Sequence, residues 1–480
     1  MGALGPNGTC AKRAPQRTST TMTTITDFDQ GSALLHFSRN GAFGPGAGEL
    51  LVLERGEGPY VFDTHGRRYV DGLSSLFCAQ IGYSYGEEMA AVAGDQLSKL
   101  AFNTLWGTAH PAALQLADRL ADLAPPGIDR IFFTSGGSES VEAAWKIVRQ
   151  YHVANGQPQR MKAIARNIAY HGVTLGALAL TGVPGFKEPF GPPAIDTTHV
   201  SNTNSFRNPL QGEELTKALV DEMEQAILDA DPETVAMIIA EPVQNAGGSL
   251  VPPPGYWPAL RHLADRYGIV LVADEVITGF GRLGEWFGST RVEAAPDIIT
   301  TAKGLTSAYA PMGAVFVSEH IAAPLYDQGR TLLHGITFGG HPLCAAIALK
   351  NLEIFERDGV LENVRAREPK LEALLNTLRE LPIVGDVRGL GFFWAVELVK
   401  GPDNERLDAD EREQVLRGFM PGALREAGLI ARADDRGDAV LQIAPPLVAD
   451  DAVLEEIVSA MREVLADAGK LLGLDSSVAA

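Results

Sequence analysis

The sequence predicts an α/β fold: a large domain with a mostly parallel sheet covered by helices, and a smaller α+β domain built from N- and C-terminal segments. Between about residues 86 and 345, apolar runs of strand length alternate with helical periodicity, which is typical of βαβ units. Shorter strands and separate helices precede and follow this stretch. We therefore expect a disordered tail over 1–30, a first part of the small domain over 31–85, the large domain over 86–345 and the rest of the small domain over 346–480.

The expected elements follow the chain in order. Residues 50–83 alternate apolar and polar side chains around glycine turns, which predicts short strands. For the large sheet we expect strands at 131–134, 163–166, 235–240, 269–273 and 314–317, with helices at 138–155 and 257–267 among those between them. The C-terminal region predicts two helices after 341, a strand near 384–399, a helix near 411–427, short strands near 429–433 and 439–443, and a helix near 450–465.

Charge and cysteine content exclude several classes of protein. The chain has 60 acidic and 40 basic residues, a net charge of −20, which disfavours binding to nucleic acid or to anionic membranes. Cys10, Cys78 and Cys344 are far apart and show no metal-ligand spacing, so we expect neither disulfides nor a metal site. The reducing cytoplasm fits this cysteine usage best. No apolar run approaches the roughly 18 residues of a membrane span.

Lys303 is the most isolated lysine of the chain, because no other charged residue lies between Asp297 and Glu319. Its small neighbours leave room for a bulky group beside the amine. A buried amine loses solvation, so its pKa falls and its lone pair becomes available. Lys303 is therefore a candidate Schiff-base nucleophile. The alternative is a structural lysine that extends from a loop into solvent.

Two carboxylates follow apolar strand candidates. Asp274 ends the most apolar run of the chain, and Glu241 ends another. Ligands of parallel sheets collect at the carboxyl ends of the strands. A carboxylate there needs a cationic partner, and the pyridinium nitrogen of pyridoxal phosphate is such a partner, because an aspartate keeps that ring protonated. A strand-end or helix-capping aspartate is the alternative.

The stretch "FFTSGGSESVEAAWK", residues 132–146, leads from a strand into a helix through small residues. Gly136 and Gly137 allow close approach of the backbone, and the free N–H groups near Ser138 form an anion site. Because the loop has no lysine, it is not a Walker A motif. Plain capping of the helix by Ser135 or Ser138 is the alternative.

Together, the phosphate motif, the strand-end aspartate and the lysine resemble the class III aminotransferases, which are pyridoxal-phosphate enzymes of fold type I. The resemblance extends from about residue 35 to 470. It includes "AYHGVT" at 169–174, "EPVQNAGG" at 241–248, "DEVITGFGR" at 274–282, "AKG" at 302–304, "GITFGGHPLCAA" at 335–346 and "APPL" at 444–447. It implies pyridoxal 5'-phosphate as cofactor, with pyridoxamine phosphate as its second form.

The resemblance implies a role for four residues around the cofactor ring. Lys303 would bind the cofactor covalently and later move a proton as the base. Asp274 would pair with the ring nitrogen. Val276 and Tyr170 would lie on opposite faces of the ring.

The same resemblance implies how the phosphate is held. Gly136, Gly137 and Ser138 would bind it, and Thr337 would reach it from the neighbouring subunit. Glu241 is also placed among the cofactor-binding residues. A site completed by its neighbour implies an obligate homodimer, and a tetramer is the alternative assembly.

Within the family, the omega-transaminases of the amine:pyruvate type resemble the chain best, through Phe102–Pro111 and "LIARADD" at 429–435. They imply S-selective, ping-pong transfer of an amino group from a primary amine or omega-amino acid to pyruvate, which becomes alanine. Arg432 would bind a substrate carboxylate with its planar fork and swing away for an apolar amine. A solvated arginine is the alternative.

The substrate pocket differs from the family pattern at one position. Phe77 stands where relatives commonly have tryptophan, which leaves the size of the pocket open. Leu105 and Trp106 would line the same pocket as Phe77, and Tyr170 is expected to contact substrate as well.

Three other functions compete with this one. The first is another class III reaction, of the gamma-aminobutyrate, diamine or ornithine aminotransferase type or an aminomutase. The second is a catalytically silent binding protein of the same fold. The third is a nicotinamide-dependent dehydrogenase that uses the glycines of Gly279–Gly284. Those glycines start five residues after Asp274, and residues 298–318 contain no carboxylate to bind a ribose, so they predict turns instead.

Overall fold

The computed structural model describes residues 33–43, 50–327 and 329–474, which form two compact units. The first contains the described residues up to Arg55 together with Phe62–Arg67, and the second contains Gly56–Val61 and the chain from Arg68 onward. The disordered tail expected over 1–30 lies outside the described residues. None of the helices in the described ranges has the length and apolar character needed to cross a membrane.

Local hydrogen bonds order the first unit. The Asn40 amide accepts from the Leu35 N–H at 2.7 Å and donates to the Leu35 carbonyl at 3.0 Å. Asp63 Oδ1 accepts from the N–H groups of His65 and Arg67, both at 2.9 Å, which fixes the turn between them.

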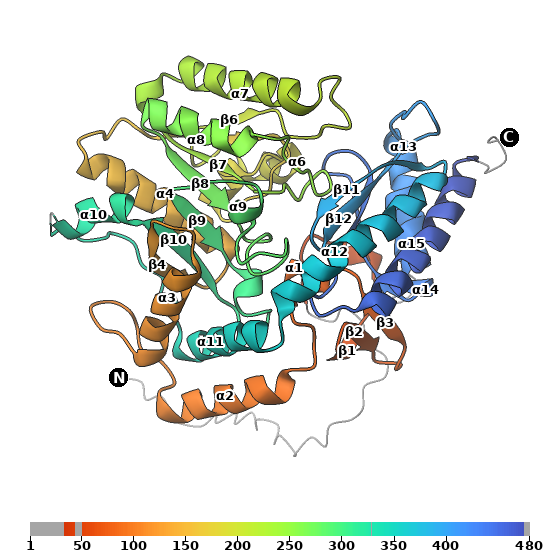
Figure 1. Ribbon diagram of the computed structural model, residues 1–480, viewed down its shortest axis with the longest axis horizontal. Helices are drawn as coiled ribbons and strands as arrows, with labels where there is room; N and C mark the ends of the chain where they lie inside the picture. The colour runs from red at the N-terminus through yellow and green to blue at the C-terminus, as the bar shows by residue number, and fades with distance from the viewer. Residues whose placement is uncertain (1–32, 44–49, 328, 475–480) are drawn as a thin grey trace, which may run out of the picture. The chain divides into compact units, whose positions relative to one another are not determined.

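A seven-stranded sheet forms the centre of the second unit (Figure 1). Its strands are β4 (Ile128–Thr134), β5 (Lys162–Arg166), β6 (Thr197–Val200), β7 (Val235–Ala240), β8 (Val270–Asp274), β9 (Ile298–Thr301) and β10 (Gly313–Ser318). Their order is β4-β10-β9-β8-β7-β5-β6. Strand β10 is antiparallel to both neighbours, and the pairings from β9 to β6 are parallel.

Helices surround this sheet and continue towards the C-terminus. They are α1 (Ser74–Phe77), α2 (Gly86–Lys99), α3 (Pro111–Leu123), α4 (Gly137–Ala154), α5 (Leu175–Leu180), α6 (Pro184–Lys187), α7 (Gly212–Asp229), α8 (Tyr256–Tyr267), α9 (Gly288–Arg291), α10 (Glu319–Asp327), α11 (Pro342–Arg357), α12 (Val360–Asn376), α13 (Ala409–Arg412), α14 (Met420–Glu426) and α15 (Asp451–Leu471).

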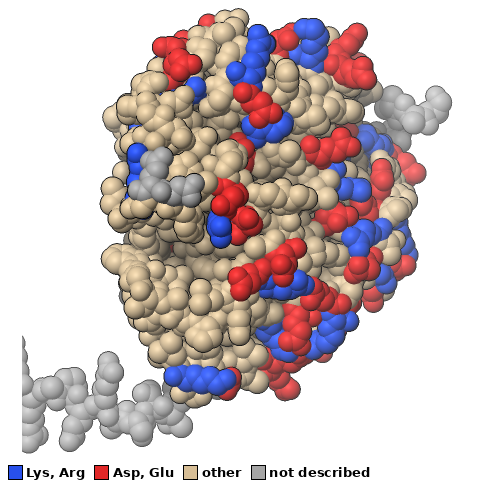
Figure 2. All heavy atoms as spheres, turned by 60° about the vertical axis from the view of Figure 1, so that its left-hand side comes forward, with Lys and Arg blue, Asp and Glu red and all other residues tan. Residues whose placement is uncertain are grey.

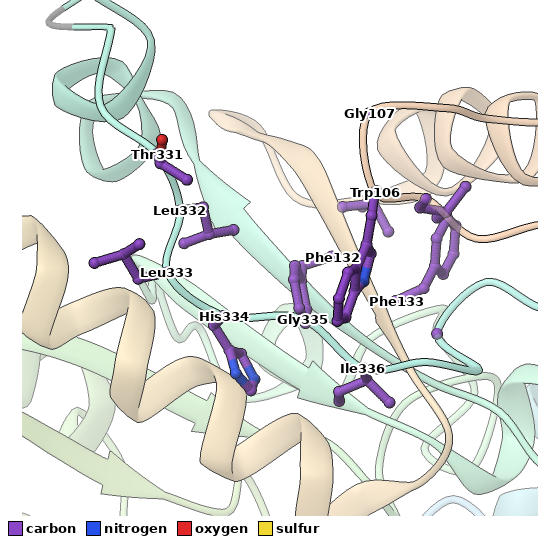
Figure 3. A pocket seen from close by; sticks show the side chains of 13 residues that line it. Trp106, Gly107, Phe132, Phe133, Thr331, Leu332, Leu333, His334, Gly335 and Ile336 are labelled. Carbon is purple, nitrogen blue, oxygen red and sulfur yellow. The ribbon is translucent and has the colours of Figure 1, made fainter.

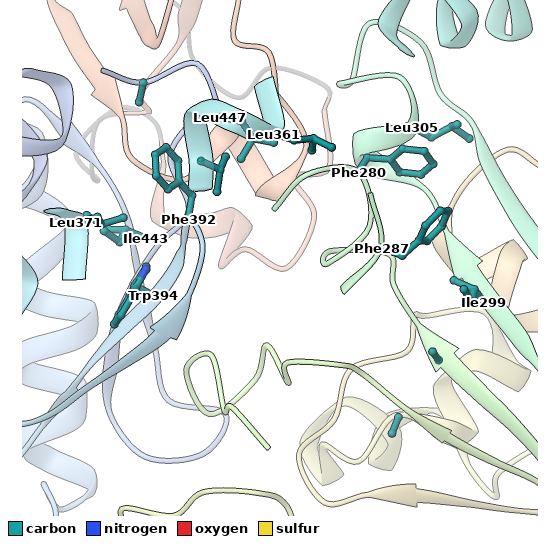
Figure 4. Packing of buried hydrophobic residues seen from close by; sticks show 14 of the residues in the cluster. Phe280, Phe287, Ile299, Leu305, Leu361, Leu371, Phe392, Trp394, Ile443 and Leu447 are labelled. Carbon is teal, nitrogen blue, oxygen red and sulfur yellow. The ribbon is translucent and has the colours of Figure 1, made fainter. Parts of the chain in front are cut away.

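Alternate side chains of the large sheet enter different hydrophobic clusters. Val270 and Val272 pack with residues of α4, whereas Leu271 and Ala273 belong to a second cluster that includes residues of α7 and α8. Successive side chains of a strand point to opposite faces, so helices cover both faces of the sheet. Figure 4 shows part of the second cluster, with Phe287 beside Ile299 of β9.

The C-terminal part of the second unit contains an antiparallel sheet of β11 (Val384–Leu390), β12 (Phe393–Leu398), β15 (Val440–Ile443) and β14 (Arg432–Asp434), in that order. Strand β13 (Leu429–Ile430) pairs in parallel with β3 (Arg68–Asp71), so an N-terminal and a C-terminal segment share backbone hydrogen bonds. The two short strands β1 (Leu53–Glu57) and β2 (Tyr60–Asp63) precede β3.

The predicted fold class is confirmed, with differences in detail. Strands β6 and β9 were not expected, and β10 runs against the parallel direction. The single strand expected near 384–399 is a hairpin of β11 and β12. Its turn contains Gly391 at φ 58°, where a Cβ atom would lie 2.5 Å from the Arg282 carbonyl oxygen, so only glycine fits. The helix expected near 411–427 is interrupted by a π-helical segment, Glu413–Phe419. The division into large and small domains stays a prediction.

Candidate active site

A cavity of about 190 Å³ lies at the carboxyl ends of β5, β7, β8 and β9. Such a position at the end of a parallel sheet is where ligands usually bind. Seven residues singled out from the sequence line it: Gly137, Ser138, Tyr170, Glu241, Asp274, Val276 and Lys303.

Asp274 is held on both carboxylate oxygens at the end of β8. His171 Nδ1 lies 2.7 Å from Oδ2, while Oδ1 accepts from the Thr300 hydroxyl at 3.1 Å and from the Val276 N–H at 3.2 Å. The side chain is 5% exposed, so its orientation is set by these bonds and not by water. A buried carboxylate in this arrangement can stabilise a cation in the cavity.

His171 is a functional residue that the sequence argument missed. It is buried beside Asp274, and its Nε2 has no hydrogen-bond partner among the described residues. The only signal in the sequence was its place directly after Tyr170 in an otherwise small or apolar stretch.

Lys303 begins the short turn Lys303–Leu305 directly after β9. Its φ of 38° lies in the left-handed region, which is strained for a residue with a side chain. Its amine lies 5.8 Å from the centre of the Phe77 ring and makes no hydrogen bond or ion pair with another described residue. Burial lowers the pKa of this amine, which favours the neutral, nucleophilic form.

The start of α4 forms a concave backbone surface beside Val276. A Cβ atom at Gly137 would lie 2.9 Å from Val276 Cγ1, so this position needs glycine. The Ser138 hydroxyl accepts from the Val173 N–H at 3.1 Å. The first N–H groups of this 18-residue helix have no partner within the helix, so they can bind an anion. Gly136 precedes the helix as its N-cap and does not line the cavity.

Glu241 orients the loops around Tyr170. Its two oxygens accept from the Tyr170 N–H at 3.3 Å and from the Asn245 N–H at 2.8 Å. Burial raises the pKa of Glu241 and of the Tyr170 phenol. The Tyr170 ring is therefore a neutral face of the cavity at physiological pH.

Of the predicted substrate residues, Tyr170 lines this cavity, whereas the others lie outside it in the single chain. Phe77 is buried and packs edge-on against Phe393, with ring centres 5.6 Å apart, while its neighbour Leu76 lines the cavity. Arg432 lies in β14, and its side chain makes no hydrogen bond or ion pair with any other residue that the structure describes. Burial, and next the charge of Arg436, lower the pKa of Arg432 to about 10.

Leu105 and Trp106 line a second hollow of about 760 Å³ (Figure 3). Its walls are apolar and partly open: Trp106 is 64% and Leu333 80% exposed. The rings of Phe132 and His334 stack there at 5.3 Å. Thr337 is exposed and lines neither cavity. The roles predicted for these residues stay predictions.

The glycines of Gly279–Gly284 form turns, as the sequence predicts. The Gly281 N–H donates to the Glu285 carbonyl at 3.0 Å, and the Gly284 N–H donates to the Gly281 carbonyl at 2.9 Å. A Cβ atom at Gly281 would lie 2.6 Å from Leu447, so this glycine serves packing. No helix begins here to bind a dinucleotide.

Comparisons with known proteins agree with this geometry. The family model described as aminotransferase class-III matches residues 43–465. A probable aminotransferase of Mycobacterium tuberculosis is 46% identical, over 91% of this chain and 93% of its own. A putrescine–pyruvate aminotransferase of Pseudomonas aeruginosa is 38% identical, over 86% and 90%.

Solved structures with the same fold include two omega-transaminases. A thermostable (S)-enantioselective enzyme from Thermomicrobium roseum has a TM-score of 0.84 and 42% identity, over 88% of this chain and 93% of its own. An enzyme of Pseudomonas jessenii, in complex with PMP, has a TM-score of 0.85 and 34% identity, over 92% and 97%.

Proposed function

The chain belongs to the class III aminotransferases, and we propose that it transfers an amino group from a primary amine or omega-amino acid to pyruvate, with S-selectivity. The donor would leave as an aldehyde or ketone in one half-reaction, and pyruvate would become alanine in the other. The likeness to an (S)-enantioselective omega-transaminase and to a putrescine–pyruvate aminotransferase supports this choice.

The residues of the cavity fit pyridoxal phosphate, the cofactor of this family. The cavity combines a buried carboxylate, an amine without a partner and a helix start open to an anion. We assign Asp274 to the ring nitrogen, Lys303 to covalent attachment, and Gly137 and Ser138 to the phosphate, with Gly136 as the residue that sets the start of α4. When bound, the cofactor would supply the electron sink for the transfer.

Two further residues would enclose the ring from its faces. Val276 lies two residues after Asp274 and close to Gly137 at the start of α4, and we assign its side chain to one face of the ring. Tyr170 is assigned to the other face, and Glu241 holds its backbone.

Lys303 is the base in this proposal. Its lowered pKa increases the neutral fraction of the amine near pH 7, so the amine can accept a proton from the substrate carbon and return it to a neighbouring atom. The missing hydrogen-bond partner leaves the amine free to move between these atoms.

The observation that carries the choice of substrate is the unpaired guanidinium of Arg432. The side chain is half-buried, so the cation has lost part of its solvation, and a carboxylate ligand would compensate for that loss. L-alanine and pyruvate supply such a carboxylate. Phe77 is assigned to the wall of the substrate pocket, below the Lys303 amine.

We further propose a homodimer in which Leu105, Trp106 and Thr337 contribute to the partner's site; a tetramer of two such dimers is the alternative assembly. The exposed apolar side chains around the second hollow support a protein interface there. Charged side chains are also unevenly spread, and Figure 2 shows a broad stretch of surface in which they are sparse. The free thiols of Cys78 and Cys344 support a location in the reducing cytoplasm.

Two half-reactions test this function. Holoenzyme mixed with L-alanine should release one pyruvate per site, and (S)-1-phenylethylamine should react faster than its R-enantiomer. Putrescine and gamma-aminobutyrate, tried in parallel, test the other class III reactions. Rapid reaction of one of these with no release of pyruvate from alanine would reject the proposed acceptor.

A further inference from the structure

Two arginines lie near Tyr170, and only one of them is paired. Arg436 Nε lies 2.9 Å from both oxygens of Asp434, and its Nη2 donates to Oδ2 at 2.7 Å. The two side chains are 8% and 6% exposed. The Arg436 guanidinium lies 5.8 Å from the centre of the Tyr170 ring. The Arg432 side chain, in contrast, makes no hydrogen bond or ion pair within the described part of the chain.

The unpaired state of Arg432 is unexpected from its position in β14. Residues two apart in a strand project from the same face, so Asp434 is the carboxylate that the strand itself presents to Arg432. The charges do interact: Asp434 opposes the lowering of the pKa of Arg432. Yet both oxygens of Asp434 accept hydrogen bonds from Arg436, four residues further along the chain from Arg432.

The other carboxylates of this loop are also engaged. Asp435 accepts from Arg417 Nη2 at 2.6 Å, and Asp438 accepts from Arg406 Nε at 2.6 Å. Asp434, Asp435 and Asp438 are therefore all paired with arginines other than Arg432. The planar fork of Arg436 is well suited to hold Asp434, because it can occupy both oxygens at once.

We propose that Arg436 is a positioning residue that keeps Asp434 away from Arg432, so that Arg432 stays free to bind the carboxylate of the substrate. This inference rests on the proposed function, in which Arg432 binds that carboxylate. An Arg432 already paired with Asp434 would have to break this pair for every keto acid that binds. Arg436 removes this competition without contacting the substrate.

The test removes the fork of Arg436 and compares substrates with and without a carboxylate. In holoenzyme carrying Arg436→Met, Asp434 becomes available to Arg432. We expect KM for pyruvate and L-alanine to rise about tenfold, which corresponds to about 1.4 kcal/mol, with kcat nearly unchanged. KM for (S)-1-phenylethylamine, which has no carboxylate, should stay within about twofold.

A double variant distinguishes the effect of freeing the Asp434 carboxylate from a general loss of structure. Arg436→Met combined with Asp434→Asn removes the competing charge, so KM for pyruvate should return to near the wild-type value. Propionate is a carboxylate that does not react. Its affinity, measured by calorimetry, should fall in Arg436→Met and return to near the wild-type value in the double variant. Arg417→Met breaks the neighbouring pair with Asp435 and should leave both KM values unchanged.

The outcomes distinguish this inference from the function on which it rests. If Arg432→Ala raises KM for pyruvate but Arg436→Met does not, the inference is wrong and the function stands. A KM for pyruvate that stays high in the double variant also overturns it. So does an equal rise in KM for pyruvate and for the amine in Arg436→Met. If Arg432→Ala leaves KM for pyruvate unchanged, the proposed carboxylate site itself is wrong.

Discussion

The cavity around Lys303 and the hollow beside Trp106 are built in opposite ways. In the first, buried polar groups such as Asp274 are fixed by hydrogen bonds from their own chain. In the second, large apolar side chains such as Leu333 are left exposed. The polar groups of the first region are thus held in place within one chain, whereas the second region is an apolar surface left exposed in the single chain. The two regions need different tests. Changes to the hydrogen-bonded groups should alter the reaction rate, whereas changes to the exposed apolar side chains should alter the association of subunits.

The largest effect is expected from the polar region. Asp274→Asn keeps the shape of the side chain but removes its charge, so the half-reaction with L-alanine should slow by about a hundredfold or more. Rapid-mixing spectroscopy of the cofactor would measure this rate. Asp265→Asn makes the same chemical change at an exposed position of α8 and should leave this rate unchanged. Equal rates in both variants would remove Asp274 from the mechanism.

Substitutions in the apolar region should weaken the dimer before they change the reaction. Trp106→Glu and Leu333→Glu place charges in the second hollow, so each should weaken the dimer by at least about thirtyfold, as expected for central interface residues. Sedimentation velocity at several concentrations measures this dissociation. Leu228→Glu changes an exposed position of α7 that does not line the hollow, and this control should leave the dimer unchanged. Unchanged dimers in the two test variants would place the interface elsewhere.

A smaller effect is expected at His171, whose role in this account is to hold Asp274. His171→Phe removes the donor to Asp274 Oδ2 and should lower kcat about tenfold, as partners of functional groups usually do. His171→Asn retains a donor and should recover most of the loss. If the phenylalanine and asparagine variants behave alike, the histidine contributes only packing.

The smallest effect concerns the stability cost of burying Lys303. Its folded pKa lies below the ordinary value of about 10.4, so between the two values the unfolded chain binds a proton that the folded chain does not. Stability therefore rises with pH across this window, and the cost is greatest below it.

Lys303→Met removes this cost. In cofactor-free protein the variant should melt a few degrees above wild type at pH 7, and the difference should shrink by pH 10.5. Melting curves of both proteins at each pH provide the comparison. A difference that does not change with pH would show that the lysine is not the titrating group.

Most of the polar region could be predicted from the sequence, because isolated charges at strand ends have few structural explanations. Lys303 and Asp274 stood out for this reason, and the structure brings them into one cavity. His171 did not stand out, since its function depends on a contact 103 positions away. The pairing of Arg436 with Asp434 was equally hidden, because Asp434 lies two residues from both Arg432 and Arg436 and the spacing does not distinguish them.

The limits of the fold prediction have similar causes. Continuous apolar runs predicted β5, β7 and β8 well, because these strands are buried on both faces. The hairpin of β11 and β12 was predicted as one strand, since its turn depends on the single conformation of Gly391. The reversed direction of β10 follows from sheet pairing, which local patterns do not encode.

The most direct test of the central claim is borohydride reduction of the protein after incubation with pyridoxal phosphate, followed by peptide mapping. We predict that wild type retains one cofactor per chain on the peptide that contains Lys303. Lys303→Ala should retain none, although its visible spectrum can still show bound cofactor. Failure of wild type to take up the cofactor, or attachment at another lysine, would contradict the account.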